Sequence, residues 1–197
     1  MNSCAYCNTN ALYRDRSNGA YLCLAHTRLE VVGPRGEAPR PPLTIRPSIP
    51  ADHQQIAELA LYFWGETEIE CFGQSYQVSA LPAYVACDGG EIVGAVSYAR
   101  QDDVDTLITL NVLPQWQGRG VAKKLIAAVV EQARTNGTTR LITATSNDDL
   151  SALALYQRLG FTITGVLVGR LVEHHNGVEP GFGGIPVRDE IQLELRL

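Results

Sequence analysis

No stretch of this 197-residue chain is long and apolar enough to span a bilayer. A transmembrane helix needs roughly 20 consecutive apolar residues, whereas the longest apolar runs, such as Val121 to Val130, are interrupted by residues like Lys123 and Lys124. The start of the chain also lacks the basic and apolar segments of a secretory signal peptide. We therefore expect a cytoplasmic protein with no membrane partner.

The composition excludes several broad classes of protein. Hydrophobic residues make up 45% of the chain and charged residues 19%, which is typical of one globular domain with a modest appendage. No internal repeat is visible. A collagen-like, coiled-coil or wholly disordered chain is therefore excluded.

Charge is distributed unevenly along the chain. Residues 1–50 carry six arginines against three acidic residues, a net charge of +3, whereas residues 51–197 carry ten basic and eighteen acidic residues, a net charge of −8. An acidic main part argues against a nucleic-acid backbone as its principal ligand and mildly favours a cationic ligand. The basic first part leaves contact with nucleic acid or with a protein open.

Three of the five cysteines lie near the start of the chain at metal-ligand spacing. Cys4 and Cys7 form one pair, and after fifteen residues Cys23 and His26 form a second pair with the same spacing. Thiolate and imidazole ligands suit a tetrahedral structural Zn²⁺ site with no open position. The spacing resembles that of zinc-ribbon or knuckle modules, so we expect a zinc-binding module over residues 1–32. It either docks a partner or only orders the terminus.

A proline-rich segment separates this module from the rest. Six prolines lie between Val32 and Pro50 with no apolar periodicity, which indicates an extended, semi-rigid linker over residues 33–42. The main domain is then expected over residues 43–197.

Apolar periodicity predicts alternating strands and helices in the main domain. A capping box is expected at Asp52 and Gln55, and a tight hairpin at 88–90. The predicted strands are 43–46, 83–87, 92–99, 105–112, 141–144, 161–168 and 190–197, and the predicted helices are 52–64, 120–133 and a third from Asp148 or Asp149 to Leu159.

In the middle of the main domain, a predicted strand passes through a glycine-punctuated turn directly into a helix. Gly118, Gly120 and Ala122 leave the backbone N–H groups at the helix start uncovered, which favours the binding of a phosphate. Arg119 and Lys123 add positive charge. The spacing fits neither a dinucleotide-binding fingerprint nor a P-loop.

This turn resembles the signature of the GNAT superfamily of N-acetyltransferases. The family pattern Gln/Arg-x-x-Gly-x-Gly/Ala is matched by Gln117, Gly120 and Ala122. Residues 152–161 are similar to the second coenzyme-side motif of that family, Ala-x-x-Leu-Tyr-x-x-x-Gly-Phe. Both motifs occur in the order and at the separation found in the family.

The resemblance covers roughly residues 43–197 and implies an α/β fold with a mixed, mostly antiparallel twisted sheet flanked by helices. It also implies transfer of an acetyl group from acetyl-CoA to a primary amine, with the thioester in a gap where the sheet opens, often at a β-bulge. Asp149 stands where many members have Asn. The residues that the resemblance places against the coenzyme are Leu110, Asn111, Val112, Gln117, Gly118, Arg119, Gly120, Val121, Ala122 and Lys123.

The reaction requires two proton transfers. An attacking amine, with a pKa near 10, must lose a proton, and the departing thiolate, with a pKa of about 8.5, must gain one. The family pattern places Tyr156 to donate a proton to the sulfur, and backbone N–H groups near Val112 to polarise the thioester carbonyl. The base stays open between residues that are expected near the strand mouth or in the loop before the last strand. These candidates are Asp105, Asp189, Glu190, His174 and His175.

The acceptor is suggested only by charge. Glu66, Glu68 and Glu70 form an acidic run after the first helix, in a region that often covers the acceptor site in this family. The run favours a small cationic acceptor such as an aminoglycoside-type antibiotic or a polyamine. The alternatives are a protein or peptide amine, or a non-catalytic acyl-CoA-binding protein whose basic zinc module docks a partner. Family members often dimerise, so a homodimer is among the expected states.

Overall fold

The structure is a computed structural model that describes residues 13–14, 21–22, 43–175 and 177–197. The four predicted zinc ligands, Cys4, Cys7, Cys23 and His26, and the predicted linker 33–42 lie outside these residues. Two short strands are described in the N-terminal part. Strands β1 (Tyr13–Arg14) and β2 (Tyr21–Leu22) pair in an antiparallel manner.

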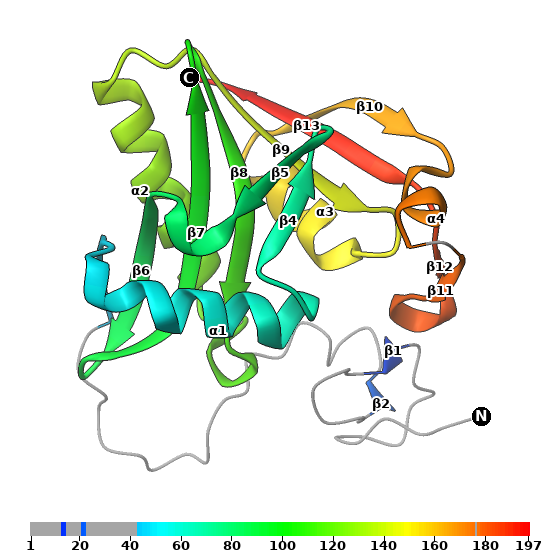
Figure 1. The fold of residues 1–197 in the computed structure, drawn as a ribbon, viewed down its shortest axis with the longest axis horizontal. Helices are drawn as coiled ribbons and strands as arrows, with labels where there is room; N and C mark the ends of the chain where they lie inside the picture. The colour runs from blue at the N-terminus through cyan, green and yellow to red at the C-terminus, as the bar shows by residue number, and fades with distance from the viewer. Residues whose placement is uncertain (1–12, 15–20, 23–42, 176) are drawn as a thin grey trace.

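A seven-stranded sheet forms the centre of the main domain (Figure 1). The strand order is β10-β13-β9-β8-β7-β6-β3, and every neighbouring pair is antiparallel except β8 and β9, which are parallel. The predicted mixed, mostly antiparallel sheet is therefore confirmed. Its strands are β3 (Thr44–Pro47), β6 (Ala83–Asp88), β7 (Glu91–Gln101), β8 (Val104–Val112), β9 (Arg140–Ser146), β10 (Thr162–Leu167) and β13 (Glu190–Arg196).

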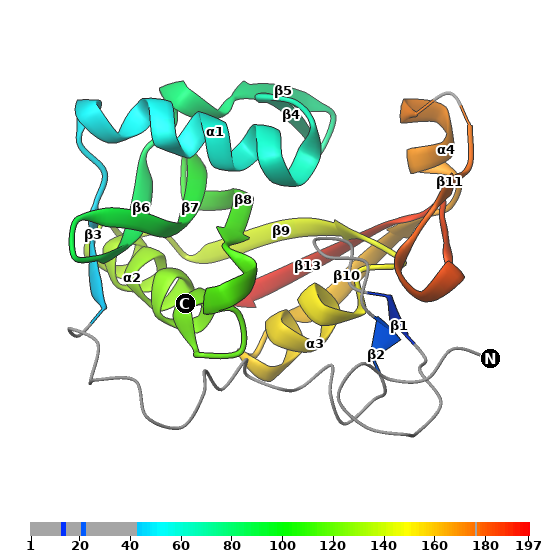
Figure 2. The same ribbon diagram turned by 90° about the horizontal axis from the view of Figure 1, so that it is seen from below.

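Other elements cover both faces of the sheet (Figure 2). Helix α1 (His53–Trp64) and the hairpin of β4 (Glu68–Cys71) and β5 (Gln74–Gln77) cover one face, called the α1 face here. Helices α2 (Val121–Thr135) and α3 (Leu150–Arg158) cover the other, called the α2 face. Within the part of the chain that the structure describes, no helix is long and apolar enough to cross a membrane.

The sequence did not predict the β4–β5 hairpin. Its turn is made by Phe72 and Gly73, both with positive φ (51° and 72°), a conformation that hairpin turns usually obtain from Asn-Gly or Asp-Gly. Between β10 and β13, where only a loop was expected, the chain forms helix α4 (Arg170–His174) and the strands β11 (Glu179–Pro180) and β12 (Pro186–Val187).

The predicted capping box at Asp52 and Gln55 is wrong. The Asp52 carboxylate accepts hydrogen bonds from the Arg46 guanidinium at 2.6 and 2.9 Å and from the Ile49 N–H at 2.8 Å. The bond from Arg46 lowers the pKa of Asp52. This carboxylate therefore ties β3 to the start of α1 instead of capping the helix.

The other helix ends agree with the sequence. Gly65 follows α1 in the left-handed conformation, with φ of 79°, as a glycine after a helix commonly does. Asp149, one of the two predicted caps of α3, accepts a hydrogen bond from the Ala152 N–H at 2.9 Å.

Asp105 has a structural role. Its carboxylate is fully buried and accepts hydrogen bonds from Arg100 Nε and Nη2, both at 2.8 Å. The residue lies near the start of β8, whereas the glycine-rich turn follows the end of that strand. Asp105 is therefore not the base, because its oxygens are bonded to a guanidinium and it lies at the end of β8 that is far from the glycine-rich turn.

Candidate active site

The sheet opens between β8 and β9 beyond Leu107. The two parallel strands are paired from Val104 with Arg140 to Leu107 with Thr143, and the pairing ends there. Beyond this point β8 stays paired only with β7 and β9 only with β13, among the residues the structure describes. The two strands diverge in Figure 1. One edge of each strand thus faces the opening.

A β-bulge lies at the point of separation. Ser97 of β7 pairs with Thr109, and the next residue, Tyr98, pairs with Leu107, so Ile108 is an extra residue in β8. A bulge bends its strand and increases the local twist. This bend accounts for the departure of β8 from β9, and the predicted opening at a bulge is therefore confirmed.

The end of β8 presents backbone groups to the opening. The Leu113 N–H donates to the Val93 carbonyl of the β7 side at 2.9 Å. Backbone groups point to opposite sides in successive residues of a strand, so those of Asn111 point to β7. The N–H and C=O of Leu110 and the N–H of Val112 point into the opening.

The glycine-rich turn joins this strand to α2. Gly118 and Gly120 have φ of 74° and 76°, which suits glycine because it has no Cβ. Lys124 donates to the Gly120 carbonyl at 3.1 Å, so the N–H groups of residues 121–123 have no carbonyl partner within the helix. The helix therefore starts with three donors directed toward the turn.

Two side chains shape the turn. Gln117 Nε2 donates to the Val112 carbonyl at 2.9 Å, which holds the turn against the end of β8. The Arg119 guanidinium lies 5.2 Å from the ring centre of Trp116, in cation–π range. The residues that the resemblance assigned to the coenzyme are thus brought together around one strand end and one helix start.

Tyr156 of α3 lies at the apex of the opening. Its side chain packs on the α2 face, with ring centres 5.3 Å from Phe161, and only 5% of the residue is exposed. Burial raises the pKa of the phenol to about 12, although a hydrogen bond with Thr143 lowers it. Thr143 is the last residue of β9 that pairs with β8. The phenol therefore keeps its proton at neutral pH.

Polar side chains line the α1 face beside the opening. Trp64 Nε1 of α1 donates to Asn111 Oδ1 at 3.0 Å. The hydroxyls of Ser97 and Thr109, which are opposite each other in the sheet, are buried without a hydrogen-bond partner among the described residues. No local sequence pattern predicts the bond from Trp64, which joins residues 47 positions apart.

Gly94 is a further residue that sequence reasoning missed. A Cβ built there would lie 2.9 Å from the Asn111 carbonyl oxygen and 3.2 Å from Val112 Cγ2. A glycine inside a strand often marks such a close approach, and this was the available signal. Because Gly94 has no side chain, β7 can approach the end of β8 this closely.

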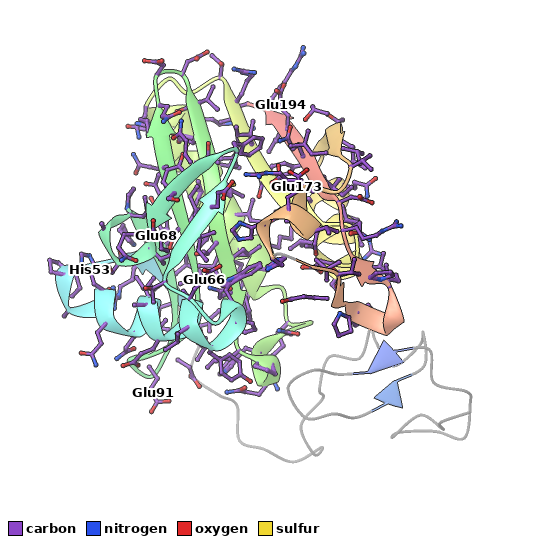
Figure 3. All side chains as sticks on the ribbon, turned by 45° about the vertical axis from the view of Figure 1, so that its right-hand side comes forward. His53, Glu66, Glu68, Glu91, Glu173 and Glu194 are labelled. Atoms are coloured by element: carbon purple, nitrogen blue, oxygen red, sulfur yellow. The ribbon has the colours of Figure 1, made fainter. Side chains whose placement is uncertain are left out.

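Only part of the acidic run Glu66, Glu68 and Glu70 is available to bind a ligand. Glu70 forms an ion pair with Arg170, and His174 Nδ1 lies 3.3 Å from its other carboxylate oxygen. Glu66 and Glu68 are exposed near α1 and β4 (Figure 3). The negative charge that the run offers to a ligand is therefore smaller than the sequence suggests, and His174 is engaged with Glu70.

Two further candidate bases, Asp189 and His175, contact other polar groups of the protein. Asp189 accepts a hydrogen bond from the Gly169 N–H at 2.9 Å, and His175 Nδ1 lies 3.9 Å from a carboxylate oxygen of Glu179. Glu190 is 9% exposed and begins β13 next to the opening. In the described part of the chain, no cluster of three or more histidine, cysteine or acidic side chains is arranged to hold a metal ion.

Known proteins share this sequence pattern and fold. The sequence model of the Acetyltransferase (GNAT) family matches residues 51–161. An aminoglycoside N(6')-acetyltransferase type 1 from Stenotrophomonas maltophilia is 32% identical over 133 residues, which cover 61% of this chain and 87% of that protein. An acetyltransferase from Bacillus subtilis, solved in complex with CoA, superimposes with a TM-score of 0.66 at 22% identity, over 79% of this chain and 99% of that chain.

A mammalian relative is matched over a shorter part. N-acetyltransferase family 8 member 2 from Rattus norvegicus is 36% identical over 88 residues, which cover 42% of this chain and only 39% of that protein. The family match, by contrast, spans more than half of this chain and includes both motifs that flank the opening. The chain therefore belongs to the GNAT acetyltransferase family and is an acyltransferase enzyme.

Proposed function

We propose that this enzyme acetylates a primary amine of a small cationic molecule at the opening between β8 and β9. The observation that carries the proposal is the end of β8–β9 pairing at Leu107 and Thr143, on the strand that the glycine-rich turn joins to a helix start with uncovered N–H groups. A strand edge without a partner can pair with an extended ligand. A helix start can hold a phosphate. Acetyl-CoA offers both a chain with amide groups and a diphosphate.

The coenzyme contacts follow from the direction of the backbone. The groups of Leu110 and the N–H of Val112 pair with the amides of the pantetheine arm. Asn111 and Gln117, which the resemblance also assigned to the coenzyme, instead hold the site in shape, since one is bonded to Trp64 and the other to the Val112 carbonyl. The pyrophosphate lies against the turn and the first turn of α2, at Gly118, Arg119, Gly120, Val121, Ala122 and Lys123.

Tyr156 acts as the general acid. Its phenol lies where the strands separate, and its raised pKa, about 12, keeps it protonated. It donates that proton to the thiolate of CoA as the carbon–sulfur bond breaks. A backbone N–H near Val112 polarises the thioester carbonyl during attack.

Charge supports a cationic acceptor. Residues 51–197 carry a net charge of −8, and Glu66 and Glu68 are exposed beside the α1 face. One relative, from Stenotrophomonas maltophilia, is an aminoglycoside N(6')-acetyltransferase type 1. An acidic surface raises the local concentration of a cationic substrate.

We also propose that residues 1–32 bind one structural zinc ion through Cys4, Cys7, Cys23 and His26. Three thiols and an imidazole are a donor set that suits Zn²⁺. The pairing of β1 with β2 places Tyr13 opposite Leu22, and Cys23 directly follows Leu22. Such a hairpin between two ligand pairs supports a zinc module, and the metal would contribute folding free energy there.

The central experiment measures thiol release from acetyl-CoA with kanamycin, spermidine and glutamate as acceptors. Kanamycin or spermidine is expected to react and glutamate is not, because an acidic surface attracts cations and repels anions.

Ala122→Glu is expected to weaken acetyl-CoA binding by about tenfold or more in calorimetry, because a carboxylate then faces the pyrophosphate.

Ala127→Glu is the matched control, since residue 127 is exposed on the same helix. A glutamate in the first turn of a helix is favourable for the helix itself, and an unchanged thermal midpoint in Ala122→Glu shows that a loss of binding does not reflect unfolding. Equal binding by both variants, or reaction with glutamate alone, would contradict the proposal.

Tyr156→Phe is expected to lower kcat by about 100-fold or more, because a general acid contributes roughly that factor, with the acetyl-CoA affinity unchanged. Because the pKa of the phenol is raised to about 12, ionisation of Tyr156 produces no decrease in kcat below about pH 10. Tyr98→Phe is the control, because Tyr98 is a buried tyrosine of the same core. Full turnover in Tyr156→Phe would remove the role.

Elemental analysis of the purified full chain is expected to find about one zinc per chain. Cys7→Ser should lose this metal, since three ligands hold Zn²⁺ less well than four. Cys87→Ala should keep it, because Cys87 is a buried free thiol of the main domain. A wild-type chain without zinc, or zinc retained in Cys7→Ser, would disprove the module.

A further inference from the structure

Glu190 begins β13 at the edge of the opening. It pairs with Ser146, the last residue of β9, which lies three residues beyond Thr143, where the pairing with β8 ends. At the rise of a β-strand, three residues correspond to about 10 Å along the opening. Glu190 therefore lies beside the part of the opening that faces the end of β8.

The side chain of Glu190 is directed to the α1 face. Opposite residues in an antiparallel pair share a face, so Glu190 shares its face with Ser146, and Ala144, two residues earlier in β9, lies on that face too. Ala144 packs against Cys71 of β4, on the α1 face. Burial, and to a smaller extent the nearby charge of Glu190, raise the pKa of the Cys71 thiol to about 12. The effect of Glu190 on this thiol agrees with its placement on the α1 face.

The Glu190 carboxylate is buried without a positive charge beside it. Its Oε1 accepts a hydrogen bond from Gln192 Nε2 at 2.8 Å, and 9% of the residue is exposed. No ion pair joins it to a lysine, arginine or histidine of the described ranges. By comparison, Glu70 pairs with Arg170 and Glu194 pairs with Arg140.

A buried carboxylate costs free energy unless a cation or several donors stabilise it. Among the residues that the structure describes, the side-chain donor to this carboxylate is the neutral amide of Gln192. An ammonium group that enters from the α1 face would supply the missing charge. This arrangement suits a group that first attracts a protonated amine and then takes its proton.

We propose that Glu190 is the general base of the acetyl transfer and that Gln192 is a positioning residue that orients its carboxylate. The proposal rests on the proposed function. Tyr156 packs on the α2 face at the apex of the opening, whereas Glu190 lies on the α1 face at its edge. Acid and base thus flank the opening from opposite faces, so the amine enters on one side and the thiol leaves on the other.

The proton balance is complete with these two groups. The Glu190 carboxylate takes one proton from the acceptor ammonium, and the free amine attacks the thioester carbon to form a carbon–nitrogen bond. When the carbon–sulfur bond breaks, the sulfur leaves with the electron pair and receives the Tyr156 proton. The tyrosinate then regains a proton from the nitrogen of the new amide, and Glu190 releases its own to solvent.

Several titratable groups lie near Glu190 in the sequence or on the neighbouring strands. The Cys71 thiol of β4 stays neutral at neutral pH, because its pKa is raised to about 12. Asp189, the preceding residue, accepts a hydrogen bond from the Gly169 N–H. In the loop after β9, Asp148 accepts a hydrogen bond from Ser146 at 2.5 Å. Strand β10, on the other side of β13, contains no titratable residue.

Further charged groups on the α1 side of β13 belong to β4 and α4. Glu70 precedes Cys71 and is paired with Arg170 and His174. Arg170 thus offsets the negative charge of Glu70. If activity decreases at low pH in the wild type but not in Glu190→Gln, the decrease is assigned to the Glu190 carboxyl.

The test compares amines that differ in protonation. With kanamycin or spermidine, which are protonated at neutral pH, Glu190→Gln is expected to lower kcat/KM by about 100-fold or more. With methoxyamine, which is mostly unprotonated at neutral pH, the rate should change by less than about threefold, because no proton must first be removed. Acetyl-CoA affinity by calorimetry should match that of the wild type.

Glu194→Gln is the matched control. Glu194 lies on the same strand and face but opposite Ile142, where β9 is still paired with β8 (Figure 3). It is expected to keep wild-type kinetics. Gln192→Leu should keep the fold but move the low-pH limb of kcat/KM to higher pH, because a carboxylate that loses a donor is protonated more easily.

The outcomes separate the two proposals. If Glu190→Gln binds acetyl-CoA normally and keeps its rate with the protonated amines, or loses the methoxyamine rate equally, Glu190 is not the base, while the proposed function stands. If the wild-type chain binds no acetyl-CoA, or accelerates transfer to none of these amines, the proposed function itself fails.

Discussion

The extra residue in β8 is the feature on which the rest of the site depends. Because Ile108 is inserted opposite the Ser97–Tyr98 step, β8 bends away from β9 and leaves backbone groups without a strand partner. Such an edge inside a sheet would be unfavourable if it stayed empty of hydrogen bonds. It becomes useful when an extended ligand supplies them. The bulge thus leaves unpaired backbone groups that an extended ligand can bind.

Neighbouring interactions keep this opening in shape. Gly94 allows β7 to approach the end of β8 closely, and Gln117 and Trp64 each hold one polar group of that end. At the other end of β8, the ion pair of Arg100 with the buried Asp105 carboxylate anchors the strand where it is still part of a continuous sheet. The same strand is therefore fixed at its start and at its end, and open only along one edge.

Local sequence signals predicted the elements well. Apolar spacing identified α1 and α2, and the glycines of residues 117–123 identified the turn, because each of these features is encoded over a few residues. Contacts between distant residues were not predictable in this way. Asp52 follows a capping pattern but bonds Arg46, and Glu70 belongs to an acidic run but pairs with a residue 100 positions later. Long-range partners override the local preference in both cases.

Hydrogen exchange of single amides tests the central claim most directly. The Leu110 and Val112 N–H groups face the opening, whereas the Asn111 N–H faces β7. Saturating acetyl-CoA is therefore expected to slow exchange at Leu110 and Val112 by about tenfold or more, which corresponds to about 1.4 kcal/mol, and to leave Asn111 nearly unchanged. Unchanged exchange at Leu110 and Val112, in a chain shown by calorimetry to be saturated, would contradict the account.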